Sequence, residues 1–563
     1  MATLSRLRSR SASFRSQTKG RFGVLATAVS DCYRAARVSS AAREDSKQPS
    51  IDASAADTLL LLGYGQPDPS GRDGPTKLSS FDTLTISNID GDALNKQAGK
   101  YLAPVLNDGS FFYSRSEDCA LRLAMQTAHM QRHKKLAVQP EARKESPPSS
   151  SKRPSPPTVE GRHVWNTFML APFVKLGEGL TEAERQILHE DFLLPLVRGF
   201  FGNTRVKHGS VSLDVRLISR RDWHREGTRF LKRGIDGAGD VAAFAETELR
   251  LRVLPDGGVP EHTVSFVLVR GSVPAYWTEK PRVSGQLCLG IAKDAVDVSL
   301  SPFVDHINHL TEAYGPVHAM AFLHGQPRGW LAAEAHLLQL YKDLVTSAQR
   351  GGDTFVEEMK LDAVEFSEQD LKPGQLDLVP GKIGKMVDAF LDQSGWTRVQ
   401  GNVGSPDAVL VRKQKGVLRI NCRDCCDRTN LGQFSCSAQA IRKILQELGL
   451  PPLDGSPLDQ AHRNLWADNG NVLSRIYTGG NSMTANFIER GHPTLEDAVK
   501  NKANSVRRMR QALQFDDAKN GATEILTGEH KPHSGARACS IADLLVPEEG
   551  LPPLSLRLVG RSP

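Results

Sequence analysis

Hydrophobic and polar positions alternate over residues 210–269 with the two-residue period of β-strands. The runs VSLDVRLIS, TELRLRVL and HTVSFVLV predict three strands, and Asp-Gly-Gly marks a turn between the last two. Earlier in the chain, the apolar run at 59–62 opens a first ordered region near Asp57. That region reaches a strand-like triplet at 111–113 and a helix-like stretch at 117–129.

Two stretches have the spacing of an amphipathic helix, with apolar residues three or four positions apart. The first, at 181–194, ends at Pro195, and its apolar positions are Ala183, Ile187, Leu188 and Leu194. The second, at 430–448, ends at Gly449, and its stripe comprises Leu431, Phe434, Ala438, Ile441, Leu445 and Leu448. A short apolar run at 417–420 predicts a buried strand just before it. Helices and strands mixed in this way, without an internal repeat, predict an α/β or α+β fold.

The composition divides the chain into segments. Its 563 residues, 39% of them hydrophobic, suffice for two or more domains. The segment at 132–162 is rich in proline, serine and basic residues, and cannot bury enough apolar surface to fold. We predict a disordered basic arm at 1–50, a first subdomain at 51–207 interrupted by this insert, a second subdomain at 208–528, and a disordered tail at 529–563.

Charge and cysteine content bear on the compartment. The net charge is +7, and residues 1–43 hold nine arginines or lysines against the single acid Asp31. Such an arm is typical of a transit peptide, of a segment that touches anionic lipid, or of a solvated tail. No apolar run approaches the roughly 18 residues that cross a bilayer, so we expect no transmembrane anchor. The eight cysteines, three of them crowded together, lack the spacing of a disulfide framework and favour a reducing compartment.

The crowded cysteines lie in a loop between the predicted strand and the second helix, where Arg428 follows Cys422 at the sixth position. A tight loop at a helix N-terminus turns backbone N–H groups inward and can cradle a phosphate dianion. The same field stabilises a thiolate, so Cys422 could attack phosphorus while Arg428 grips phosphate oxygens through two N–H groups. Thr429 can hydrogen-bond the thiolate. Asp424 and Asp427 are the carboxyls able to protonate the leaving oxygen and then activate water, and which of them does so is open.

Other interpretations of these cysteines are weaker. Cys422 and Cys425 have Cys-x-x-Cys spacing, but no second Cys or His pair stands nearby to complete a zinc site. A redox pair would leave Arg428 unexplained. Packing is the interpretation that we prefer for Cys425 and Cys426. We therefore expect neither a metal nor a cofactor.

The string RINCRDCCDRTN at 419–430 resembles the R-x-N-C-x-D-C-x-D-R-T-N signature of the Sac-domain phosphoinositide phosphatases, the family shared by the yeast suppressor-of-actin phosphatase and the synaptojanins. Five further segments resemble this family in the same order along the chain. They are FFYSRSEDCALRL, VWN followed by PLVRGF, the long block ISRRDWHREGTRFLKRGIDGAGDVAAFAETE, VRGSVPAYW, and WADNGNVLSRIYTGG. The resemblance covers roughly residues 57–528.

The resemblance implies an N-terminal Sac subdomain and a catalytic subdomain related to cysteine phosphatases. It implies metal-independent removal of a 4- or 3-phosphate, with the 5-phosphate as a further option, from the inositol ring of phosphatidylinositol phosphates through a phosphocysteine. The catalytic residues would be Cys422, Asp424, Asp427, Arg428 and Thr429. The candidates for substrate binding are Arg423, Cys425, Cys426, Arg419, Asn430, Arg220, Arg221, Lys232 and Arg233. The basic members suit anionic headgroups, and a solvated basic face with local pairing to Asp222 and Glu226 is the alternative.

The chain departs from the family pattern in two of its motifs, and the region at 356–366 also matches the family poorly. Cys426 stands where the signature has leucine, and Tyr477-Thr-Gly-Gly-Asn481 replaces Tyr-x-Gly-Thr-Gly. The ring position is thus less well specified than the chemistry. A phosphotyrosine phosphatase and an inactive headgroup-binding scaffold are the alternative functions. We expect a cytoplasmic protein, peripheral on the cytosolic face of membranes and active in membrane trafficking. We also expect that it binds no nucleic acid and has a possible adaptor at the arm or tail.

Overall fold

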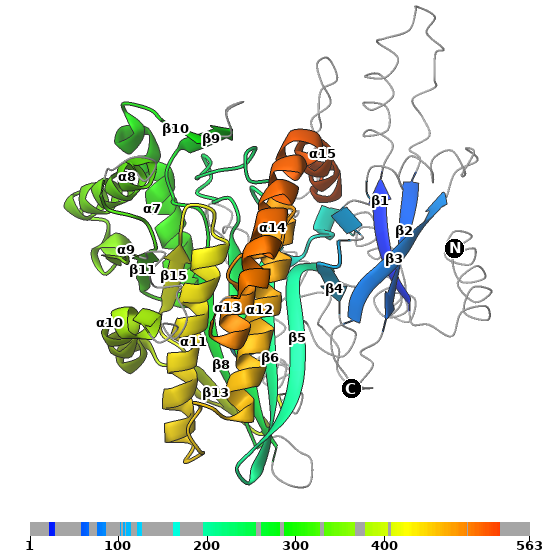
Figure 1. Cartoon of the computed structure of the whole chain (residues 1–563), viewed down its shortest axis with the longest axis vertical. Coiled ribbons are helices and arrows are strands. Elements are labelled where there is room, and N and C mark those ends of the chain that lie inside the picture. The colour runs from blue at the N-terminus through cyan, green and yellow to red at the C-terminus, as the bar shows by residue number, and fades with distance from the viewer. Residues whose placement is uncertain are drawn as a thin grey trace, which may run out of the picture. The chain divides into compact units, whose positions relative to one another are not determined.

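The structure is a computed structural model of the chain (Figure 1). It describes residues 22–28, 58–66, 76–85, 102, 105–106, 108–113, 121–126, 161–168, 170, 195–254, 261–281, 287–326, 332–365, 378–403, 407–492 and 494–529. The chain forms two compact units: residues 1–119, 164–197 and 521–563 in the first, and residues 120–163 and 198–520 in the second. The predicted insert and tail lie almost wholly outside the described residues, and the helix expected at 181–194 lies outside them entirely.

The first unit contains an antiparallel sheet. Its strands are β1 (Phe22–Ala28), β2 (Thr58–Gln66), β3 (Thr76–Thr85) and β4 (Phe111–Tyr113), and each pairs with the next. Strand β4 confirms the strand predicted at 111–113, whereas β1 lies inside the arm that we expected to be disordered. In the same unit the Trp165 ring packs edge-on against Phe111 with centroids 5.7 Å apart, and the Leu196 N–H donates to Asn166 Oδ1 at 2.8 Å.

The second unit is built on a mixed sheet. Strands β5 (Val197–His208), β6 (Val211–Arg221), β7 (Ala245–Leu254) and β8 (His262–Arg270) form an antiparallel meander, which confirms the three strands predicted at 210–269. Beyond β8 run β15 (Val417–Asn421), β11 (Val317–Ala321) and β12 (Lys360–Ala363), all parallel to one another. The same edge of β8 also pairs with β13 (Thr397–Gln400), which pairs with β14 (Val409–Arg412), while β9 (Trp277–Pro281) and β10 (Leu287–Ile291) form a separate hairpin.

Helices cover both faces of this sheet. The α-helices of this unit are α7 (Ala295–Tyr314), α8 (Ala332–Arg350), α9 (Thr354–Glu357), α10 (Leu378–Ser394), α11 (Asp427–Glu447), α12 (Pro457–Thr478), α13 (Ala485–Arg490) and α14 (Leu495–Gln514), and α15 (Asp516–Thr527) follows at the boundary with the first unit. Leu418 and Ile420 of β15 pack into a core with α10, α11 and α12, whereas Val417 packs with α7 and α8. Burial on both faces is typical of parallel strands and explains why all five residues of β15 are buried. Among the described helices, none combines the length and apolar character needed to cross a membrane.

A buried ion-pair network joins β6 to β7. The Arg220 guanidinium is fully buried, and its two Nη atoms donate to Glu246 at 2.9 Å and to Glu248 at 2.8 Å. Glu248 also accepts from Arg250 and from the Ser265 hydroxyl. Burial alone would raise the pKa of Glu248, but the charges of Arg250 and Arg220 hold it well below the usual value. The network therefore requires ionised glutamates.

Replacing Glu248 by glutamine should lower the free energy of unfolding by about 3 kcal/mol at pH 7, because it leaves buried guanidinium charge uncompensated. A carboxyl whose pKa is lowered by folding stabilises the native state above its unfolded pKa, and that contribution is lost as the pH falls. The difference between wild type and Glu248→Gln should therefore shrink below about pH 4.5. Denaturant unfolding across this range measures it. The exposed Glu261→Gln should change stability by less than about 0.5 kcal/mol, and a difference that grows on acidification would contradict the argument.

Candidate active site

The loop at 422–426 joins the end of β15 to the start of α11, as the sequence pattern predicts. Cys422, with 3% of its surface exposed, follows the last residue of a buried strand. Cys425 has a φ of 53°, a left-handed conformation that is uncommon for a side chain of this size and turns the loop sharply. Helix α11 begins at Asp427, three residues before the predicted start. Asp427, Arg428 and Thr429 therefore lie in its first turn.

Arg428 forms a bidentate ion pair with Glu334 of α8. Its Nη1 and Nη2 atoms donate to the two carboxylate oxygens at 2.8 Å and 2.6 Å. The Glu334 side chain is 2% exposed and also accepts from the His324 N–H at 3.3 Å. Burial opposes ionisation, but the bonds from Arg428 hold the pKa of Glu334 below its usual value. Glu334 was not predicted from the sequence, because no local pattern connects two residues 94 positions apart.

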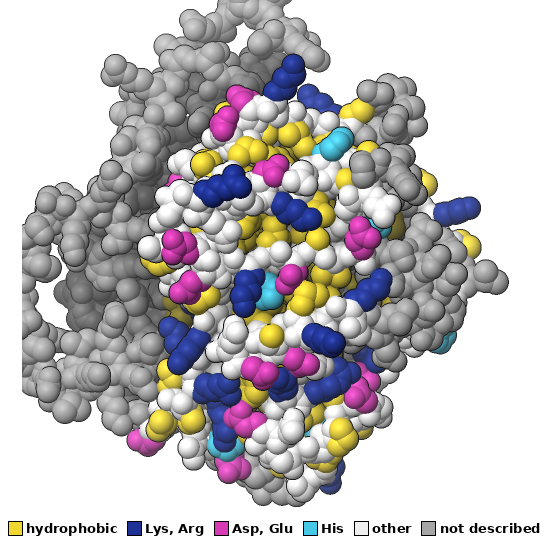
Figure 2. All heavy atoms as spheres, turned by 90° about the vertical axis from the view of Figure 1, so that its left-hand side faces the viewer, with side chains coloured by type: hydrophobic (Ala, Val, Ile, Leu, Met, Phe, Trp, Pro, Cys, Tyr) yellow, Lys and Arg dark blue, Asp and Glu magenta, His cyan; other side chains and the backbone are white. Residues whose placement is uncertain are grey.

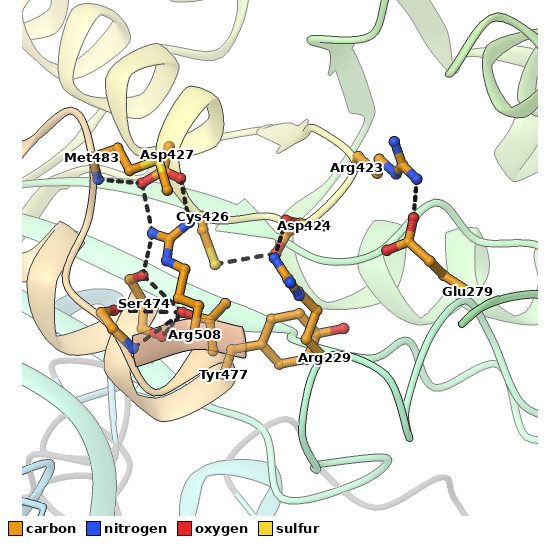
Figure 3. Close-up of polar contacts among 12 residues, drawn as sticks. Arg229, Glu279, Arg423, Asp424, Cys426, Asp427, Ser474, Tyr477, Met483 and Arg508 are labelled. Atoms are coloured by element: carbon orange, nitrogen blue, oxygen red, sulfur yellow. Dashed lines mark hydrogen bonds and ion pairs between the residues drawn. The ribbon is translucent and has the colours of Figure 1, made fainter. Parts of the chain in front are cut away.

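Asp424 pairs with two arginines from the loop between β6 and β7, of which Figure 3 shows Arg229. Arg233 donates to Oδ1 at 2.7 Å, and Arg229 donates to Oδ2 at 3.2 Å. Burial would raise the pKa of this carboxyl, but the two guanidinium charges hold it far below its usual range. Arg233 and Arg423 also pair with Glu279 of β9, a carboxylate with no exposed surface. The arginines beside the loop are thus held in fixed positions by acidic partners.

Asp427 has a different set of partners (Figure 3). Arg508 of α14 donates to its two oxygens at 3.0 Å and 3.2 Å. The Met483 N–H and the Ser482 hydroxyl donate to Oδ1 at 2.8 Å and 2.9 Å. The side chains of Asp424 and Asp427 keep 25% and 21% of their surface exposed. Both carboxylates therefore remain accessible, although each is anchored by arginine.

The residues that follow Arg428 have separate roles in the structure. Thr429 is fully buried, and among the described residues its hydroxyl has no hydrogen-bond partner. Asn430 donates to the Trp466 carbonyl at 2.9 Å and accepts from Arg270 and Asn469, so it ties α11 to its neighbours. Arg270, which the sequence analysis also missed, lies fully buried beneath the loop, and burial lowers its pKa to about 10.

Cys425 and Cys426 pack with Ala243 and Tyr477 in a small buried cluster. Burial raises the pKa of Cys425 to about 12, and it raises the pKa of Cys426 as well. These two sulfurs are therefore held as thiols. The Tyr477 hydroxyl donates to the carbonyl of the half-buried Lys232 at 2.7 Å, which fixes the loop that carries Arg229 and Arg233.

Four predicted headgroup contacts need correction. Arg220 is enclosed by Glu246 and Glu248, and Arg221 is buried against Glu226. Arg419 has no exposed surface, and its guanidinium donates to His306 and to the Ser272 carbonyl. A buried guanidinium with its partners already in place cannot reach a lipid headgroup. Arg233 is excluded on the same ground, because its side chain is 2% exposed and pairs with Glu279 and Asp424. We therefore remove these four from the substrate-binding set and keep Arg423, a loop residue whose side chain is 11% exposed.

One cluster has the composition of a metal site. Asp222, His224 and Asp240 bring their ligand atoms within 4.8 Å of one another. However, Arg162 pairs with both aspartates, at 2.7 Å from Asp222, and occupies the position that a cation would take. His224 also pairs with Asp222 at 2.7 Å. The cluster is an internal ion-pair network.

Several known proteins are similar in sequence to this chain. The family model of the SacI homology domain matches residues 21–371, more than half of the chain. The polyphosphatidylinositol phosphatase INP53 of Saccharomyces cerevisiae is 28% identical over 455 residues, 78% of this chain and 36% of that protein. The phosphatidylinositol-3-phosphatase SAC1 of the same yeast is 25% identical over 390 residues, covering 67% of this chain and 58% of that protein. The phosphatidylinositide phosphatase SAC2 of Mus musculus is 25% identical over 412 residues, covering 67% and 33%. The chain thus spans less than two thirds of the length of these relatives.

Proposed function

Because the chain belongs to the family of proteins with a SacI homology domain, we propose that it is a phosphoinositide phosphatase with Cys422 as its nucleophile. The relatives described above are named as phosphatases of phosphatidylinositol phosphates, which supports the substrate class. The family match ends at residue 371, before the loop, so the role of the loop depends on its own residues. The observation that carries the proposal is the turn from β15 into α11, which holds Cys422 at one end and Arg428 at the other.

The proposed reaction has two steps. In the first, the Cys422 thiolate forms a bond to phosphorus, the bond from phosphorus to the inositol oxygen breaks, and a carboxyl group gives that oxygen a proton. In the second, water attacks the phosphocysteine, its proton returns to the carboxylate, and phosphate and the thiolate are released. Asp424 and Asp427 both remain candidates for this carboxyl. The Thr429 hydroxyl has no hydrogen-bond partner in the described part of the chain, which supports a role in stabilising the departing sulfur.

Arg428 can bind phosphate without leaving Glu334. A guanidinium has five N–H groups, and Glu334 takes one from each Nη atom. The edge formed by Nε and one Nη remains able to donate two parallel hydrogen bonds to phosphate oxygens. Glu334 is therefore a positioning residue, which fixes the direction in which Arg428 faces the phosphate.

The proposed substrates are the 4- or 3-phosphate monoesters of phosphatidylinositol, with the 5-phosphate as a further option. Arg423 lies in the loop and Arg229 lies beside it, with 11% and 13% of their side chains exposed, and both would attract an anionic headgroup. We further propose a peripheral protein on the cytosolic face of membranes that acts in membrane trafficking. An adaptor at the arm or tail stays a prediction, since almost all of both segments lies outside the described residues.

Purified protein should release phosphate from at least one phosphatidylinositol monophosphate in EDTA. We expect a rate at least about tenfold above that on a phosphotyrosine peptide, because the partly exposed arginines Arg229 and Arg423 favour a polyanionic headgroup. Phosphate release from a panel of phosphoinositides measures this. Release from the peptide alone would indicate a protein phosphatase. Headgroup binding without any release would indicate a scaffold.

A further inference from the structure

Helix α14 carries a row of exposed apolar side chains. Val499, Val506 and Leu513 are 69%, 70% and 70% exposed, and they are the most exposed large apolar residues of the described part of the chain. They recur every seven residues, so they lie along one side of the helix. Thr494 and Asp497 form a capping box that fixes the start of the helix. The three exposed apolar side chains therefore lie on a helix with a well-defined start.

Positive charge surrounds this row. Four exposed cations flank it: Lys500, Lys502, Arg507 and Arg510. Residues 498–515 contain no acidic residue, and Glu496 pairs with Lys500 in the first turn of the helix. Figure 2 shows another face of the molecule, where basic and acidic side chains are interspersed. From residue 498 to the end of the helix, the outward side of α14 thus combines an apolar row with charge of one sign.

The opposite side of α14 reaches the candidate active site. Arg508 is 5% exposed and holds both oxygens of Asp427 (Figure 3). It also donates to the Ser474 hydroxyl of α12 and to the Asn481 carbonyl, both at 2.8 Å. One helix therefore links an exposed surface to the first turn of α11.

We propose that the outward side of α14, defined by Val499, Val506 and Leu513 with their flanking cations, is a docking surface for an anionic lipid bilayer. The inference rests on the proposed function, since a phosphatase of membrane lipids must reach its substrate at a bilayer. Apolar side chains can insert at the boundary of the acyl chains while lysines and arginines pair with headgroups. A second copy of this helix is a poorer occupant, because pairing would bring Lys502, Arg507 and Arg510 of one copy close to the same cations of the other. Docking here would place the bilayer against the helix that anchors Asp427.

Vesicle flotation measures whether this surface of α14 binds membranes, with variants of α14 compared with a control variant elsewhere. Val506→Asp combined with Leu513→Asp should weaken binding to vesicles of phosphatidylcholine with phosphatidylserine by at least about tenfold. Hydrolysis of a vesicle-borne substrate should fall by about the same factor, while hydrolysis of a short-chain soluble phosphoinositide should stay within about twofold. The control is Val409→Asp with Val411→Asp, which alters two exposed valines of β14 and should bind vesicles as the wild type does.

Insertion is measured independently with Val506→Trp, a change that retains an apolar side chain. Vesicles with brominated acyl chains should quench its fluorescence more than that of Val409→Trp, and equal quenching would overturn the proposal. Unchanged vesicle binding by the α14 double variant would also overturn it, as would a dimer that α14 substitutions dissociate without affecting vesicles. Failure of the wild type to hydrolyse soluble phosphoinositide would instead refute the proposed function, since binding and quenching need no turnover.

Discussion

Replacing Cys422 by serine is expected to lower phosphate release by about 10⁴-fold or more. The serine hydroxyl would occupy the same place at the end of β15, but oxygen of an alcohol is a much weaker nucleophile toward phosphorus than sulfur of a cysteine. The remaining residues would still bind the phosphate, so the variant should bind a short-chain substrate within about threefold of the wild type. Single-turnover phosphate release and equilibrium binding measure the two quantities.

The control for this variant is Cys288→Ser. Cys288 is a half-buried cysteine of β10 outside the loop, and its replacement should leave the rate within about twofold of the wild type. Turnover by Cys422→Ser within about tenfold of the wild type would refute the phosphocysteine mechanism. Loss of activity in both variants would point to damage to the fold, which thermal unfolding of each protein would detect.

Local sequence patterns predicted most of the strands and the helix around the loop. Alternation over 210–269 correctly predicted β6, β7 and β8, and the apolar stripe correctly predicted α11. The start of α11 was wrong by three residues, because Cys426 at its N-cap supplies no side-chain hydrogen bond that a capping pattern would reveal. The Sac-domain resemblance is confirmed by the family match, which begins earlier in the chain than Asp57, where the resemblance was placed.

Burial and partners were less predictable. The sequence predicted that Arg220 would lie at the surface and contact a lipid headgroup. In the structure Arg220 lies directly opposite Glu246 in the register of β6 and β7, so the two side chains pair across the strands and both are buried. Arg428 pairs with Glu334, which lies 94 positions away, and Asp427 pairs with Arg508, which lies 81 positions away. Neither partner belongs to a motif that would have marked it in the sequence. Contacts of this kind depend on tertiary packing, which one-dimensional patterns do not contain.

Replacing Arg428 by lysine should lower kcat/KM by about 10³-fold, the second largest effect that we expect. Lysine preserves the positive charge but not the planar fork, so it cannot contact Glu334 and two phosphate oxygens at once. The loss should appear mainly in kcat, because charge on phosphorus oxygens develops as the ester bond breaks. Steady-state kinetics on a short-chain phosphoinositide measure it. Lys443→Arg, an exchange of the same two residue types on the outer part of α11, is the control and should change kcat by less than about twofold.

A change at Glu334 tests whether the loss of activity in Arg428→Lys comes from the orientation of the Arg428 guanidinium. Glu334→Gln keeps the shape of the side chain but removes the charge that holds both Nη atoms, so we expect kcat to fall by about ten- to fiftyfold in the wild type. In the Arg428→Lys background the fork is already absent, and the same change should cost less than about threefold. Such non-additivity is the signature of two residues that act as one unit. A purely structural Glu334 would instead lower stability in both backgrounds and leave the two kinetic effects additive. Glu357→Gln, at an exposed glutamate of α9, should be neutral in both.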